Sequence, residues 1–182
     1  MKDHFERVID YMRISITDRC NLRCRYCMPE DIEFVPHDNI LRYEEFIRLA
    51  KLFAKQGIRK IKVTGGEPLV RHGCQDFIRD LKSIDGIDNV TLTTNGVLLD
   101  RYLPDLLDAG VDAINISLDT MQKDKYFRIT GRDEFDQVWR GIQNTMAAGM
   151  KVKLNCVPIG GVNDDEIADF FERIPLMCVL SR

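Results

Sequence analysis

The 182-residue sequence has no long hydrophobic run, no excess of basic charge and only three histidines. A membrane-spanning helix needs about 20 consecutive apolar residues, and the apolar runs here are far shorter. The N-terminus, Met1 to Arg7, also lacks the apolar core of a signal peptide. The 26 Lys and Arg residues are balanced by 29 Asp and Glu residues, which argues against sequence-independent binding of nucleic acid. We therefore expect a cytoplasmic protein with neither nucleic acid nor a membrane as partner.

The sequence does contain the composition of a globular domain, with 45% hydrophobic and 30% charged residues and a mean hydropathy of -0.22. Its length predicts one domain. The six cysteines are unevenly spaced, because Cys20, Cys24 and Cys27 lie within eight residues and the other three are scattered. In a reducing compartment such a cluster indicates metal binding or catalysis before it indicates disulfides.

Strand-like and helix-like patterns alternate along the chain. The expected strands are residues 13–17, 60–64, 89–93, 112–118 and 151–157. The expected helices are residues 43–56, 75–84, 101–109 and 135–146, with a last helix after a capping-box-like start at 163–166. The stretch between residues 118 and 135 reads as irregular. Strands separated by helices cannot be hairpin partners, so the sequence predicts an α/β fold with a parallel sheet.

Each expected strand alternates apolar and polar residues, whereas a parallel strand covered on both faces is usually apolar throughout. The polar positions include Arg13, Lys62, Thr93, Ser117 and Lys153. Exposed edges of an ordinary sheet would explain one or two such strands, but not five. The pattern therefore predicts an open, barrel-like sheet with a polar lumen. Basic side chains line that lumen, and none of these polar positions is acidic, so we expect an anionic ligand.

A Cys-x3-Cys-x2-Cys loop, formed by Cys20, Cys24 and Cys27, follows the first expected strand. Three thiolates this close can occupy three corners of a cubane iron–sulfur cluster and leave the fourth iron open to a ligand. Zinc is the rival, but a structural zinc site needs a fourth protein ligand, and the nearest histidine, His37, lacks finger-like spacing. Disulfides fit neither the odd number of cysteines nor the compartment.

This loop, with Tyr26 just before its last cysteine, resembles the motif of the radical S-adenosylmethionine (SAM) superfamily. A second match is Gly65-Gly66-Glu67-Pro68, which in that superfamily lies against the methionine amino group of SAM. The segments 92–96, 115–119, 128–131 and 151–155 further resemble the GTP 3',8-cyclase family, the MoaA-type enzymes that open molybdenum cofactor biosynthesis. The resemblance runs from about residue 13 to about residue 168.

The resemblance implies a radical SAM core, which is a partial TIM-like barrel of parallel strands with outer helices, over residues 1–182. It implies that Cys20, Cys24 and Cys27 ligate one 4Fe-4S cluster, whose open iron binds SAM. The implied SAM contacts are Tyr26, Gly66 and Ser117. The implied GTP contacts are Arg13, Lys62, Thr93 and Lys153. No residue is identified as a general acid or base.

The implied reaction is that of a lyase, which converts GTP to (8S)-3',8-cyclo-7,8-dihydroguanosine 5'-triphosphate. It begins with one electron from the cluster, so an electron donor is a further expected partner. The family holds the guanine base on a second cluster in a C-terminal region that this sequence lacks. We therefore expect a C-terminally truncated, inactive or impaired chain that ends where a sixth strand would begin. The sequence leaves open whether the chain forms a homodimer.

Two alternatives remain at this point. The first is another radical SAM enzyme, such as one that modifies peptides, and the basic lumen counts against it. The second is a non-catalytic iron–sulfur-binding fragment.

Overall fold

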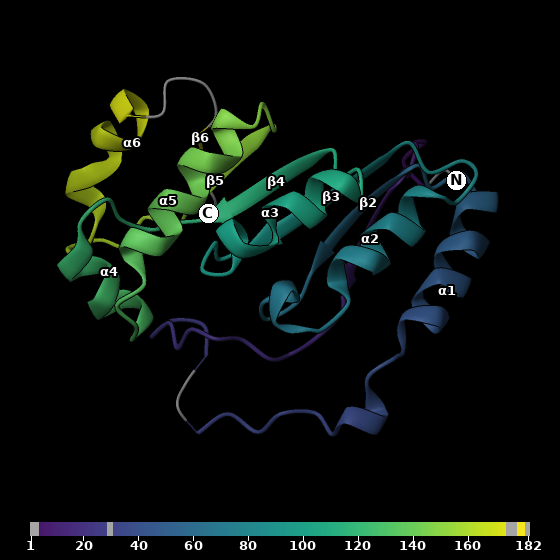
Figure 1. Ribbon diagram of the computed structural model, residues 1–182, viewed down its shortest axis with the longest axis horizontal. Helices are drawn as coiled ribbons and strands as arrows, with labels where there is room; N and C mark the ends of the chain where they lie inside the picture. Colours follow the sequence, from purple (N-terminus) through teal and green to yellow (C-terminus); the bar gives the residue numbers. More distant parts are fainter. Residues whose placement is uncertain (1–3, 29–30, 174–177, 181–182) are drawn as a thin grey trace.

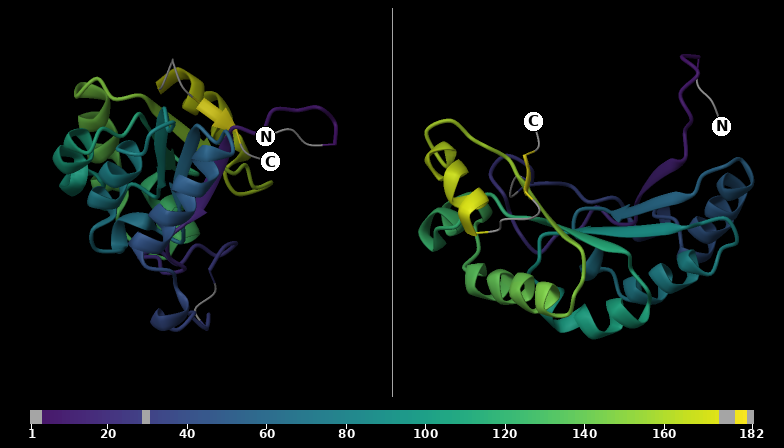
Figure 2. Two further views of the ribbon diagram at one scale, coloured as in Figure 1. Left: turned by 90° about the vertical axis from the view of Figure 1, so that its right-hand side faces the viewer. Right: turned by 90° about the horizontal axis from the view of Figure 1, so that it is seen from above.

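The structure is a computed structural model that describes residues 4–28, 31–173 and 178–180. Its centre is one parallel sheet with the strand order β1-β2-β3-β4-β5-β6. The strands are β1 (Tyr11–Ser15), β2 (Lys60–Thr64), β3 (Asn89–Thr94), β4 (Ala113–Ser117), β5 (Val152–Cys156) and β6 (Cys178–Leu180). Each strand pairs with the next one in the sequence, and the sheet curves with helices along its convex side (Figure 2). This arrangement is an open, partial barrel.

The helices alternate with the strands (Figure 1). They are α1 (Tyr43–Lys55), α2 (Cys74–Lys82), α3 (Leu99–Asp108), α4 (Lys123–Thr130), α5 (Phe135–Ala147) and α6 (Ile167–Arg173). The described residues also form the short 3-10 turns η1 (His37–Asn39), η2 (Pro68–Val70) and η3 (Asp164–Glu166). None of the helices in the described part of the chain has the length and apolarity needed to cross a membrane.

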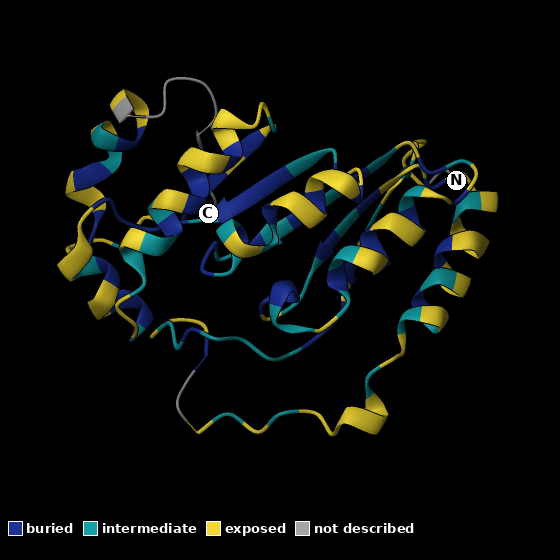
Figure 3. Ribbon diagram, in the orientation of Figure 1, coloured by how far each residue is buried: buried dark blue, intermediate teal, exposed yellow. Residues whose placement is uncertain are grey.

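The core lies between the sheet and the outer helices. Nine apolar strand side chains that face it are at most 6% exposed, and burying one of them stabilises the fold by about 1.5–3 kcal/mol. These side chains are Ile14, Ile61, Val63, Val90, Leu92, Ile114, Ile116, Val152 and Leu154. Figure 3 shows the same division, with buried strands and helices exposed on their outer faces. The alternation predicted from the sequence is therefore confirmed.

Two sequence expectations about secondary structure are wrong. The stretch expected to be irregular contains α4, whose first turn, Lys123-Asp124-Lys125, is polar and hides the helical pattern. The helix is held by one buried face, formed by Tyr126, Ile129 and Thr130. The chain also does not end before a sixth strand, because β6 pairs in parallel with Leu154–Cys156 of β5.

The expected capping box at residues 163–166 is also wrong. Asn163 makes no side-chain capping bond to η3. Its amide instead donates to the carbonyl oxygens of Asp119 (2.6 Å) and Val157 (2.9 Å), and its side-chain oxygen accepts from the Ile159 N–H. Asn163 therefore closes the loop after β5 onto the end of β4, η3 begins at the next residue, and α6 follows from Ile167.

Candidate functional site

The cysteine loop leaves the carboxyl end of β1, the end of a parallel sheet at which ligands bind in barrel folds. Backbone hydrogen bonds attach it to the last turn of α4. Arg23 N–H donates to Thr130 O (2.9 Å), and Arg25 N–H donates to Ile129 O (3.0 Å). A tight turn follows, in which Cys27 N–H donates to Cys24 O at 2.9 Å. The loop is therefore positioned by backbone groups on both sides of Cys24.

The three thiols share this loop and are free, with Cys20 and Cys24 half-buried and Cys27 exposed. In the described ranges no group of three or more His, Cys, Asp and Glu side chains converges closely enough to hold a metal ion. The residue types nevertheless suit an iron–sulfur cluster, because one loop supplies three free thiols. Cys20 Sγ also accepts hydrogen bonds from Leu22 N–H (3.4 Å) and from the Asn95 amide (3.6 Å), as cluster sulfurs do. Burial raises the pKa of Cys20 and raises that of Cys24 to about 12.

Gly66 lies against the cysteine loop at very close range. Its N–H donates to Thr17 O at 2.7 Å, and the next N–H, of Glu67, donates to Arg19 O at 2.8 Å. A Cβ atom on Gly66 would lie 2.5 Å from Arg19 O and 2.7 Å from Asp18 O. Only glycine fits this position, so the glycine pair forms a cradle beside the cysteines.

Glu67 is fully buried, and its carboxyl group accepts hydrogen bonds from residues on two segments of the site. One carboxyl oxygen accepts from Leu69 N–H (3.0 Å) and the Thr94 hydroxyl (2.8 Å), and the other accepts from Asn95 N–H (2.6 Å). Burial raises the pKa of Glu67 to about 7. The Asn95 amide continues to Asn21 Oδ1 at 2.7 Å. Glu67 thus connects the end of β3 to the cysteine loop, a role that its place in the sequence motif did not reveal.

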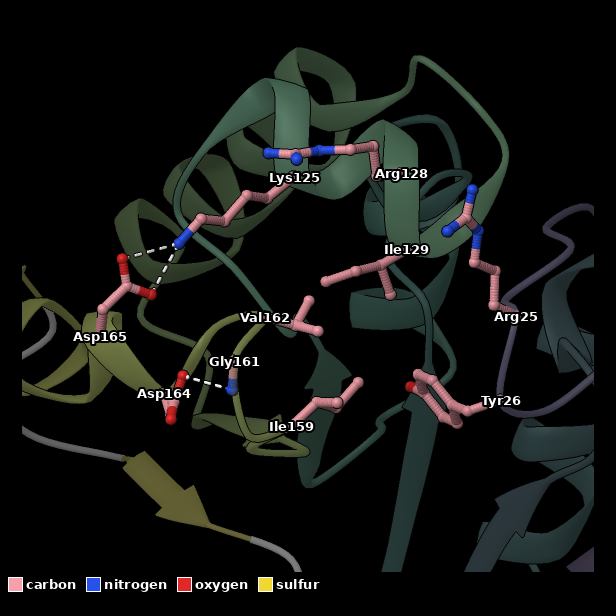
Figure 4. Close-up of a pocket in the computed structure, with 10 residues that line it drawn as sticks. All are labelled: Arg25, Tyr26, Lys125, Arg128, Ile129, Ile159, Gly161, Val162, Asp164 and Asp165. Atoms are coloured by element: carbon pink, nitrogen blue, oxygen red, sulfur yellow. Dashed lines mark hydrogen bonds and ion pairs between the residues drawn. The ribbon is translucent and has the colours of Figure 1, made fainter.

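A cavity of about 700 Å³ lies beside Tyr26, between α4 and the loop after β5 (Figure 4). Its lining includes the basic side chains of Arg25, Lys125 and Arg128, with the apolar Ile159 opposite. Lys125 is engaged by Asp165 at 2.6 Å. Asp164 and Asp165 also line the cavity, which therefore joins the cysteine loop to a wall of apolar, basic and acidic side chains.

The polar face of the sheet brings the other predicted residues together. Arg13 is the register neighbour of Lys62, and Thr93 and Lys153 are both register neighbours of Asn115. Arg13 and Lys153 are exposed, while Lys62, Thr93 and Ser117 are half-buried. Within residues 4–28, 31–173 and 178–180, no ion pair is formed by the three basic side chains of this face, Arg13, Lys62 and Lys153. The inner face is therefore positively charged and uncompensated along these rows.

Two site residues were missed as such by sequence reasoning. Glu67 and Asp119 were noted as parts of motifs, and neither was assigned a role. Asp119 accepts a hydrogen bond from the Tyr26 hydroxyl, although the two residues are 93 positions apart. The charge of Asp119 directly after the apolar end of β4 is the signal that could have identified it, because a carboxylate buried there needs partners.

Sequence comparison gives a consistent assignment. The family model for the Radical SAM superfamily matches residues 14–174. A GTP 3',8-cyclase of Heliobacterium modesticaldum is 52% identical over 172 residues, which are 93% of this chain and 53% of the relative. Molybdenum cofactor biosynthesis protein 1 of Dictyostelium discoideum is 48% identical over 174 residues, which are 94% of this chain and 28% of the relative. The chain spans about half the length of the GTP 3',8-cyclases that it matches.

Solved structures share the fold. Native anSMEcpe with bound AdoMet superimposes with a TM-score of 0.76 at 18% identity, over 93% of this chain and 51% of that one. Streptococcus suis SuiB bound to precursor peptide SuiA has a TM-score of 0.71 at 19% identity, over 89% of this chain and 36% of that one. At these identities the likeness concerns the fold alone, and it confirms the predicted partial TIM-like barrel.

Proposed function

Because this chain belongs to the radical SAM superfamily, we propose that residues 1–182 are the cluster- and SAM-binding core of a GTP 3',8-cyclase of molybdenum cofactor biosynthesis. One observation carries the proposal: the three-cysteine loop leaves the end of a sheet whose inner face holds Arg13, Lys62 and Lys153. The relatives named GTP 3',8-cyclase, at 51% and 52% identity, support the same substrate.

Cys20, Cys24 and Cys27 would hold one 4Fe-4S cluster, with SAM on its open iron. When bound, the cluster and SAM supply one-electron chemistry that generates a carbon radical. The chain's own contribution is to place SAM. Gly66 lets the backbone approach closely, Tyr26 lies on the loop between Cys24 and Cys27, and Ser117 lies at the end of β4. The cluster uses thiolates, so metal binding must overcome the raised pKa of the buried thiols.

The inner face would bind GTP through its phosphates. Arg13 offers a planar fork for two oxygens, whereas Lys62 and Lys153 offer point charges. Thr93, in the same register row as Lys153, would orient the nucleotide through its hydroxyl. Fixing the ribose near SAM is the main contribution of such residues, since small misplacements are costly in rate.

Two further components of the proposed reaction, a second cluster and an electron donor, are not assigned to residues 1–182. In the family a second cluster holds the guanine base, and we propose that it is not supplied by residues 1–182. A separate protein would donate the electron. The peptide-bound structural neighbour is 19% identical and indicates only a shared fold, so it does not favour a peptide substrate.

Calorimetric titration of GTP into the anaerobically reconstituted chain tests the substrate. Loss of a charged contact costs about 1.5–3 kcal/mol, so Lys153→Ala should weaken GTP binding by roughly ten- to a hundredfold. Lys51→Ala changes an exposed lysine on the outer helix α1 and serves as the control. Equal affinity in wild type and Lys153→Ala would contradict the proposed phosphate site.

A further inference from the structure

The hydroxyl of Tyr126 is buried in α4 without a hydrogen-bond partner in the described part of the chain. The side chain is 2% exposed, and its ring packs edge-on against Phe135 with 5.8 Å between centroids. Buried phenols nearly always bond to another group, because an unpaired hydroxyl in the interior is costly. This orphaned donor therefore requires an explanation.

The helix that carries Tyr126, α4, is hydrogen-bonded to the backbone on both sides of Cys24. The two backbone bonds from Arg23 and Arg25 to the last turn of α4 lie on either side of this cysteine. Gly131, which ends the helix at a φ of +70°, approaches so closely that a Cβ atom there would lie 3.3 Å from Arg23 O. Tyr126 lies one turn earlier and is fixed by the Thr130 hydroxyl, which donates to Tyr126 O at 2.8 Å.

Cys24 has the complementary deficit. Cys20 Sγ accepts N–H groups of Leu22 and Asn95, whereas within the described residues the one donor at Cys24 Sγ is the backbone N–H of Cys24 itself. Cys24 packs against the same hydrophobic core in which Tyr126 is buried. Burial is the main cause that raises the pKa of Tyr126, which keeps the phenol protonated. An unpaired hydroxyl donor and a sulfur that accepts from no other residue thus lie on two segments that are joined by backbone hydrogen bonds.

We propose that the Tyr126 hydroxyl donates a hydrogen bond to Cys24 Sγ once the three cysteines hold the cluster, and that this bond raises the reduction potential of the cluster. The inference rests on the proposed function, because it requires a cluster on this loop. Hydrogen bonds to cluster sulfurs stabilise the more negative, reduced state and are a main determinant of potential. Tyr126 would thus set how readily the cluster accepts its electron.

The test is an EPR-monitored redox titration of the reconstituted chain with Tyr126→Phe, which removes one oxygen and keeps the ring. We expect unchanged iron content and a three- to tenfold lower equilibrium constant for reduction, where tenfold is about 59 mV for one electron. Tyr102→Phe, in α3, is the matched control and should leave the potential unchanged. A Tyr126→Phe potential equal to wild type would overturn the inference.

The metal-free chain provides a second measurement. If the hydroxyl is unpaired until the cluster binds, Tyr126→Phe should raise the unfolding temperature of the metal-free chain by a few degrees, because it removes an unsatisfied buried group. A lower unfolding temperature would show that the hydroxyl already has a partner within the protein and would overturn the inference. Failure of the wild-type chain to take up iron would instead refute the proposed function itself.

Discussion

The Tyr26 hydroxyl donates a hydrogen bond of 2.6 Å to Asp119 Oδ2, which joins the cysteine loop to the end of β4. The other carboxyl oxygen of Asp119 accepts from Val157 N–H at 2.9 Å, just after β5. Asp119 is 8% exposed, whereas Tyr26 is 51% exposed, so a buried carboxylate holds a tyrosine that lies at the surface. One carboxylate thereby fixes three segments around the mouth of the partial barrel.

Replacing Asp119 should therefore destabilise the fold and loosen the site together. Asp119→Ala leaves Val157 N–H and the Tyr26 hydroxyl unpaired, and we expect a loss of about 1–3 kcal/mol in the free energy of unfolding. Urea denaturation of the wild type, Asp119→Ala, Tyr26→Phe and the double variant measures it. The double variant should lose less than the sum of the single losses. Strict additivity would mean that the two side chains do not interact.

Gly66→Ala should be damaging because the added methyl group meets backbone rather than a movable side chain. Overpacking of this kind costs about 1–3 kcal/mol, which should lower the unfolding temperature by several degrees. Gly160→Ala is the matched control, since a Cβ atom there meets nothing within 4 Å. Calorimetry of the two variants should separate them, and equal unfolding temperatures would exclude the close approach of Gly66 to the loop.

Glu67 should contribute a pH-dependent term to stability. Its pKa in the folded chain is raised to about 7, above the ordinary value of 4.5, so the folded state binds the proton more tightly. The stabilisation is complete below about pH 4.5 and is lost as the pH rises through about 7, by up to about 3 kcal/mol. Subtracting the unfolding free energy of Glu67→Gln from that of wild type at each pH isolates this term. A flat difference from pH 4.5 to 8 would contradict it, and Glu44→Gln, exposed on α1, is the control.

Cluster loading should depend on the three cysteines of the loop and on no other cysteine. After anaerobic reconstitution, Cys20→Ala, Cys24→Ala and Cys27→Ala should each lose most of the iron and sulfide that the wild type binds. Cys74→Ala, in the buried first turn of α2, should retain them. Full loading of the three loop variants would assign the iron to a different site.

The barrel could be predicted from the sequence because five strands repeat the same alternation of apolar and polar residues. The parallel order of the strands follows because a helix separates each strand from the next. The cysteine loop could be identified from the sequence because Cys20, Cys24 and Cys27 lie within eight residues, and their role as cluster ligands stays a prediction. Asp119 and Glu67 escaped assignment because their partners, such as Tyr26 and Asn95, lie far away along the chain. Helix α4 escaped because its stability comes from tertiary packing of one face and not from a strong local pattern.

The bonds from α4 to the cysteine loop also set an order of events during synthesis. Thr130, which accepts the Arg23 N–H, is made 107 residues after its donor, since 130 − 23 = 107. At ribosomal rates of about 5–20 residues per second, the loop waits roughly 5–20 seconds for this support. Until then the thiols of Cys20 and Cys24 lack the packing that half-buries them. Under the proposed function, iron delivery to the loop would therefore follow the synthesis of α4, and the cysteines would have to stay reduced until then.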